Sequence, residues 1–132
     1  MKLLIVTALL ILFKSSMTHA CSCVLSFPGI ITNSHTVFLA TVIPTSNGEW
    51  DLEIQHVFKG KASKQGKLRD RMAGTNCAIG EFITPLAVNV RYIISARKSE
   101  KANIFYTEAC GGIKEWDDKP LPNLGKGRSP QR

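Results

Sequence analysis

Hydrophobic and polar positions along this chain fall into two patterns. Residues 3–13 form one apolar run that only Thr7 interrupts, whereas the apolar positions beyond residue 35 come in short segments separated by Gly, Pro, Asn and Ser. Short segments rich in β-branched and aromatic residues are typical of β-strands. We therefore expect a leader followed by a mostly β domain.

Five segments carry the strand pattern. The clearest alternates Trp50, Leu52 and Ile54 with polar residues, and Ser-Asn-Gly at residues 46–48 is a hairpin signal before it. The predicted strands are residues 36–43, 50–58, 67–72, 89–96 and 103–107. Weaker signals predict a turn of helix in residues 27–34 and another in residues 112–118. This order of elements favours a sandwich or a small barrel over a βαβ fold.

The first twenty residues have the features of a secretory signal peptide. Lys2 precedes the apolar run, and Thr18 and Ala20 place small residues three positions and one position before a cleavage site. The run is shorter than the roughly 18 residues that a membrane span needs. We expect residues 1–20 to be removed and the mature protein to be secreted and extracellular, or periplasmic if the source is bacterial.

A lipoprotein signal is the alternative for the same leader, and it would place a lipid on Cys21. That signal normally has an aliphatic residue three positions before the cysteine and a small residue two positions before it. This chain has Thr18 and His19 there. The sequence therefore favours a free α-amine on Cys21 over an acylated one.

All four cysteines lie beyond the leader, at Cys21, Cys23, Cys77 and Cys110. An even number of cysteines in a small secreted domain predicts two disulfides. A bond between Cys21 and Cys23 would close a strained loop. Two arrangements remain open, and each ties the amino-terminal pair to Cys77 and Cys110. The spacing lacks the paired C-x2-C arrangement of a structural zinc site.

The mature amino terminus is itself a candidate metal ligand. If a disulfide holds Cys21, its α-amine and its carbonyl oxygen form a rigid bidentate chelate. In an extended segment Cys21 and Cys23 face the domain, while Ser22 and Val24 face outward. The amine has an ordinary pKa of about 7.7–8.0, so its neutral form is accessible near neutral pH. The alternative is that Cys-x-Cys only anchors the terminus.

Positive charge is the next feature, because the chain carries a net charge of +7. A basic cluster is a candidate anion-binding site for glycosaminoglycan or another anionic matrix, although a solvated loop is the simpler interpretation. Its members are Lys59, Lys61, Lys64, Lys67, Arg69 and Arg71. The cluster has no aromatic residue within it, which disfavours nucleic acid. Residues 119–132 are rich in Lys, Arg, Pro and Gly, which predicts a disordered basic tail.

Catalysis is not expected from this sequence. Beyond the leader the only histidines are His35 and His56, and no G-x-S-x-G motif is present. Asp51 and Glu53 lie on the polar side of a predicted strand, where solvation is the default. We therefore predict no enzyme activity and no catalytic residues.

Residues 21–118 resemble the tissue inhibitors of metalloproteinases and their netrin-like relatives. The resemblance depends on six short pieces in the same order and with matching cysteine spacing. They are Cys21-Ser22-Cys23, Val57-Phe58-Lys59-Gly60, Asn76-Cys77, Arg91-Tyr92-Ile93-Ile94, Phe105-Tyr106-Thr107-Glu108-Ala109-Cys110 and Trp116-Asp117.

The resemblance implies an OB-like five-stranded Greek-key barrel with one or two short helices and two disulfides. It pairs Cys21 with Cys77 and Cys23 with Cys110. It also implies a secreted inhibitor that forms a 1:1 complex with a zinc metalloproteinase and has no cofactor of its own.

In that family the first residue chelates the protease's zinc, which assigns that role to the backbone amine and carbonyl of Cys21. Ser22 would enter the specificity pocket, and the residues after it would lie along the cleft. The inhibitory edge implied by the resemblance consists of Cys21, Ser22, Cys23, Val24, Leu25, Gly74, Thr75 and Asn76.

The chain also departs from the family. It lacks the third disulfide and the separate Cys-rich domain of the animal inhibitors, and Val24-Leu25-Ser26-Phe27-Pro28 replaces their Pro-rich stretch. The alternative function is a netrin-like binding or matrix-interaction module in which Cys-x-Cys is purely structural.

Overall fold

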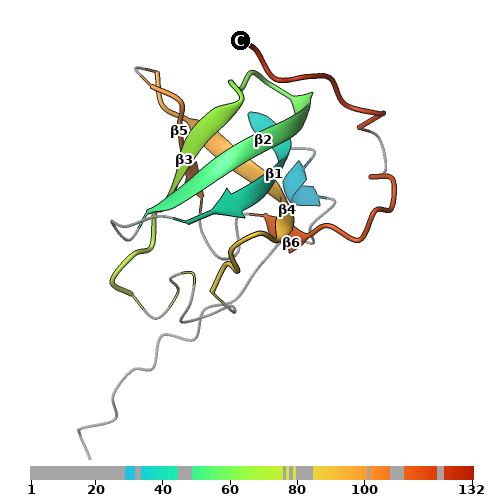
Figure 1. The fold of residues 1–132 in the computed structure, drawn as a ribbon. Coiled ribbons are helices and arrows are strands. Elements are labelled where there is room, and N and C mark those ends of the chain that lie inside the picture. The colour runs from blue at the N-terminus through green and yellow to red at the C-terminus, as the bar shows by residue number, and fades with distance from the viewer. Residues whose placement is uncertain are drawn as a thin grey trace, which may run out of the picture.

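The described part of the chain is a small β-barrel. The computed structural model describes residues 29–31, 34–44, 49–75, 77, 79, 85–100, 102–107, 112–121 and 124–132. Within these residues the strands are β1 (Thr36–Ile43), β2 (Trp50–Lys59), β3 (Gln65–Asp70), β4 (Arg91–Lys98), β5 (Ile104–Thr107) and β6 (Ile113–Glu115). Figure 1 shows the first five wrapped around one interior, with β6 beside β4.

The strand pairing closes the barrel. β1 pairs antiparallel with both β2 and β4, β2 pairs with β3, β3 runs parallel to β5, and β5 pairs with β4. The order β1-β2-β3-β5-β4 therefore returns to β1. Closure pairs most of the strand edges that a flat sheet would leave open. This mostly β, five-stranded barrel is consistent with the OB-like architecture that we predicted.

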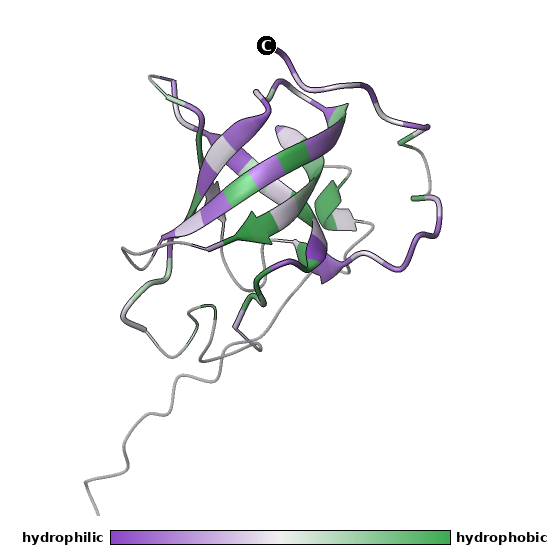
Figure 2. Cartoon of the chain, in the orientation of Figure 1, coloured by the Kyte–Doolittle hydropathy of each residue, from purple (hydrophilic) through white to green (hydrophobic). Residues whose placement is uncertain are grey.

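Alternating side chains fill the barrel interior. Phe38, Ala40 and Val42 of β1 point inward and are fully buried, as are Leu52 and Leu68 from the two following strands. Phe38 also meets Phe105 of β5, with ring centroids 4.6 Å apart in a tilted arrangement. Figure 2 shows the matching alternation of hydrophobic and hydrophilic residues along β2. A period of two with one face buried fixes the register of these strands.

A second apolar cluster lies on the outside of the barrel. Val37 and Leu39 of β1 alternate with the inward residues, and they pack with Ile93 of β4 and with Ile31. The residues that cover this outer cluster are Phe58, Trp116, Leu121 and Leu124. Part of the outer wall is therefore a small second core.

The predicted strands agree closely with the observed ones. The bounds of β1 are as predicted, and β2 extends one residue further. β3 begins and ends two residues earlier than predicted, and β4 begins and ends two residues later. Residues 29–31 are helical, within the segment where a turn of helix is expected.

The second predicted helical turn, in residues 112–118, is wrong. Residues Ile113–Glu115 instead form β6, which pairs antiparallel with β4. The backbone of Gly112 has φ 101°, and an added Cβ there would lie 2.7 Å from the Cβ of Ser95. This close approach lets the chain pair with β4, a tertiary contact that outweighs weak local helix propensity.

The carboxyl-terminal segment also differs from expectation. The composition of residues 119–132 predicts disorder, whereas Arg128 forms a β-bridge with Val57 and Gln131 forms one with Ser63. The segment packs because Leu121 and Leu124 bury apolar surface against the outer cluster.

Several predictions fall outside the described residues. They concern the signal peptide at residues 1–20 and the start of the mature chain through Leu25. None of the helices in the described part has the length and apolar character needed to cross a membrane.

Candidate functional site

Two of the eight predicted edge residues can be placed in the structure. Gly74 and Thr75 lie in the segment that follows β3, and both are exposed. The other six, Cys21, Ser22, Cys23, Val24, Leu25 and Asn76, lie outside the described residues, so their position stays a prediction.

The segment carrying Gly74 and Thr75 leaves one end of the barrel. β3 and β5 are parallel and finish together at Asp70 and Thr107, which are register partners. The backbone N–H of Arg71 continues this pairing by donating to the Thr107 carbonyl at 2.7 Å. Figure 1 shows the segment projecting beyond these strand ends. The turn therefore extends away from the closed wall.

Thr75 organises this turn through three hydrogen bonds. Its backbone N–H and its hydroxyl both donate to the Met72 carbonyl, at 3.0 and 2.7 Å. Its Oγ1 accepts from the Cys77 N–H at 3.2 Å. Gly74 supplies the left-handed backbone of the turn, with φ 81° and open space around its Cα. We call residues 71–75 the ridge; it presents a short, exposed surface of defined shape.

Cys77 links the ridge to the predicted disulfides. It is half-buried, and it is not a free thiol. The other three cysteines lie outside the described residues. The pairings of Cys21 with Cys77 and of Cys23 with Cys110 therefore stay predictions.

A second turn lies at the same end of the barrel. β4 begins beside the end of β1, and the turn before β4 is held to β1 by a 2.8 Å bond from the Asn89 N–H to the Val42 carbonyl. The Tyr92 hydroxyl accepts from the Ala87 N–H at 3.0 Å. Val88 at the tip is 47% exposed and is the only large apolar side chain exposed among the described residues. It adds an apolar contact point at this end.

The basic cluster carries its own counter-charges. Lys67 of β3 contacts Asp51, its register partner on β2, at 2.8 Å, and the Arg69 Nε lies 2.5 Å from Glu49. A third pair joins Lys64 and Glu53 at 4.0 Å. The hydrogen bond and the charge of Asp51 raise the pKa of Lys67. These acidic side chains lower the net positive charge of the surface that we predicted to bind anions.

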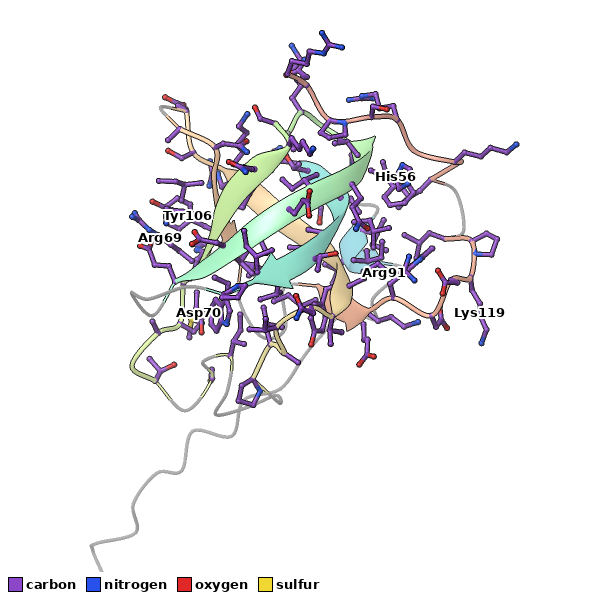
Figure 3. All side chains as sticks on the ribbon, viewed as in Figure 1. His56, Arg69, Asp70, Arg91, Tyr106 and Lys119 are labelled. Atoms are coloured by element: carbon purple, nitrogen blue, oxygen red, sulfur yellow. The ribbon has the colours of Figure 1, made fainter. Side chains whose placement is uncertain are left out.

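Tyr106 is a member of this surface that the sequence did not indicate. Its hydroxyl lies 3.4 Å from Nη1 of Arg69, a bond that contributes most to raising the pKa of Arg69 (Figure 3). Tyr106 is also the register partner of Arg97 on β4. The three residues form a row across β3, β5 and β4. Because Tyr106 lies 37 residues from Arg69 along the chain, only the parallel pairing of β3 with β5 brings them together.

The described residues offer no site for a resident metal ion. Among them, no three or more His, Cys, Asp or Glu side chains are grouped so as to hold a cation. His35 and His56 are both exposed.

Comparisons with models of known protein families and with curated proteins find no match to this chain. The functional argument therefore depends on the residues and on the geometry of the barrel end.

Proposed function

We propose that this protein is a secreted inhibitor of zinc metalloproteinases that uses the backbone amine and carbonyl of its mature first residue, Cys21. The proposal is supported by a cysteine directly after a segment with the pattern of a secretory leader, by a second cysteine two positions on, and by a closed five-stranded barrel.

The observation that carries the proposal is the position of the ridge beside Cys77. A disulfide brings two Cα atoms to within about 4.4–6.8 Å of each other. Pairing of Cys21 with Cys77 would therefore hold the amino terminus next to Thr75, whose Oγ1 already accepts from the Cys77 N–H. The amino-terminal triplet and the ridge would then form one continuous edge.

This edge would act as a preorganised wedge. The neutral α-amine and the carbonyl oxygen of Cys21 would occupy the open coordination position of the target's zinc. Ser22 would enter the adjacent pocket, and Cys23, Val24 and Leu25 would follow the substrate cleft. Gly74, Thr75 and Asn76 would contact the cleft from the side. Because disulfides and hydrogen bonds order the edge in advance, little entropy is lost on binding.

The experiment compares the mature protein with a variant that carries one additional alanine before Cys21. The extra residue converts the Cys21 nitrogen into an amide and places the free α-amine on an alanine that no disulfide holds, so the rigid chelate at Cys21 is lost. We expect inhibition of a panel of metalloproteinases to weaken at least about a hundredfold, since the amine ligand at Cys21 and its preorganised chelate with the carbonyl are lost. A chain with one alanine added after Arg132 is the matched control. Equal inhibition by the extended and mature proteins contradicts the chelation mechanism.

A second candidate function is binding to an anionic matrix polymer. It is favoured by the row of Arg69, Tyr106 and Arg97 on three neighbouring strands, in which the Arg69 guanidinium contacts the Tyr106 hydroxyl. Such binding depends on charge, so it weakens steeply as salt rises. Retention of the mature protein on heparin at several salt concentrations tests this candidate independently of protease inhibition.

A further inference from the structure

Asp70, the last residue of β3, binds two backbone N–H groups with one carboxylate. Its Oδ1 accepts from the Met72 N–H at 2.8 Å, and its Oδ2 accepts from the Ile79 N–H at 2.6 Å. Figure 3 places Asp70 at the base of the segment that follows the strand. Both oxygens of the side chain are therefore committed to the same loop.

The two bonded amides bracket the ridge and Cys77. Met72 lies at the start of the turn, and Ile79 is a buried member of the main core, 7% exposed. One side chain thus ties the beginning of the loop and its return to the barrel to the end of β3. Hydrogen bonds to an ionised carboxylate are shorter and stronger than neutral ones. The loop between the two amides is held at both ends.

We propose that Asp70 is the positioning residue of the inhibitory edge, an inference that rests on the function proposed above. It touches no part of the target; it fixes the ridge and Cys77 relative to the barrel before binding. Without it the loop would sample more conformations, and the entropy of ordering them would oppose complex formation. The complex would then dissociate faster.

The carboxylate is specific for this task. An amide side chain of the same shape has one acceptor oxygen, and its NH2 group would face a backbone N–H that also donates. Asp70→Asn therefore keeps one of the two bonds and opposes the other. Asp70→Ala removes both. The two variants therefore weaken the attachment of the loop to different degrees, and neither replaces a side chain of the barrel interior.

The experiment uses the full mature chain carrying Asp70→Asn or Asp70→Ala. The matched control is Asp118→Asn, which neutralises an exposed carboxylate bound to Arg91 at 2.9 Å. Amide hydrogen exchange at Met72 and Ile79 reports on the two hydrogen bonds to Asp70, and exchange at Leu68 and Ile94 reports on the fold. Inhibition constants and dissociation rates are measured on the same metalloproteinase panel.

We expect exchange at Met72 and Ile79 to rise about tenfold or more in the Asp70 variants, and the dissociation rate to rise about tenfold to a hundredfold. Exchange at Leu68 and Ile94 stays unchanged in Asp70→Asn, which separates positioning from unfolding. Equal dissociation rates for wild type and Asp70→Asn overturn the positioning role while leaving the proposed function intact. A wild-type protein that inhibits no protease overturns both, and it does so without any variant.

Discussion

Val57 and Arg128 exchange both of their backbone hydrogen bonds. The Val57 N–H donates to the Arg128 carbonyl at 2.8 Å, and the Arg128 N–H donates back to Val57 at 2.9 Å. β3 pairs with β2 only over Trp50 to Glu53, so the later part of β2 has an edge that the carboxyl-terminal segment fills. The Arg128 guanidinium also donates to the Gly60 carbonyl. A segment with the composition of a disordered tail thus completes the barrel wall.

A substitution at Gly127 tests whether the carboxyl-terminal segment packs on the barrel. An added Cβ would lie 3.0 Å from a ring carbon of Phe58, and the residue has φ 73°. We expect Gly127→Ala to lower the free energy of unfolding by about 2–3 kcal/mol, from backbone strain together with the ring contact. Urea denaturation followed by circular dichroism measures the change.

Gly125→Ala is the matched control for that substitution. Gly125 has a similar φ of 67° but open space around its Cα. It should cost only the strain, about 1 kcal/mol. Equal losses for the two variants would show that the segment does not pack on Phe58.

The acidic partners of the basic cluster should limit its affinity for polyanions. Glu49 and Asp51 contact Arg69 and Lys67 and offset two positive charges. We expect the double variant Glu49→Gln with Asp51→Asn to elute from heparin at a higher salt concentration than wild type. The reason is that the net positive charge of the surface facing the polyanion rises by two. Substituting Asp117→Asn and Asp118→Asn changes net charge equally and is the control. Equal elution of the two double variants would show that only total charge matters.

Lys67 should contribute a stability that disappears at alkaline pH. Its pKa is raised, first by the hydrogen bond to Asp51 and then by the charge of that residue. A raised folded-state pKa stabilises the protein below the unfolded value of about 10.4, and the stabilisation is lost as pH rises through the folded value. Because Lys67 is exposed, the effect is small.

The measurement for Lys67 is the urea midpoint on either side of its pKa, at pH of about 9 and about 11. Wild type should lose more stability over this interval than Asp51→Asn does. Glu53→Gln is the control, because its oxygen lies 4.0 Å from Lys64 and forms a weaker pair. Equal losses in wild type and Asp51→Asn would contradict the role of this pair.

Local pattern predicted the strands well, because burial on one face of a strand imposes a period of two on the sequence. The predicted β1 is unchanged in the structure, and Trp50, Leu52 and Ile54 alternate as expected. The predicted bounds of the polar strand β3 lie two residues too far along the chain. Leu68 is its one large buried side chain, so the strand carries little periodic signal. The boundary error at β3 therefore has a physical cause.

The candidate site was predictable only in part. Gly74 and Thr75 came from a resemblance of short motifs, and the structure adds that Thr75 shapes the turn and that Asp70 anchors it. The bond from the Met72 N–H to Asp70 is a local turn contact, but the bond from Ile79 is not predictable from local pattern, because Ile79 lies nine residues away in a loop without periodicity.

By itself the sequence determined which segments become the five barrel strands, although not β6, and that Trp50, Leu52 and Ile54 share one side of β2, since both follow from local propensity and from the cost of exposing apolar surface. The tertiary structure alone decided that β3 lies beside β5, that Tyr106 meets Arg69, and that Arg128 completes the edge of β2. Those contacts join residues far apart in the chain. They form because the barrel closes, and closure is a property of all the strands together rather than of any one segment.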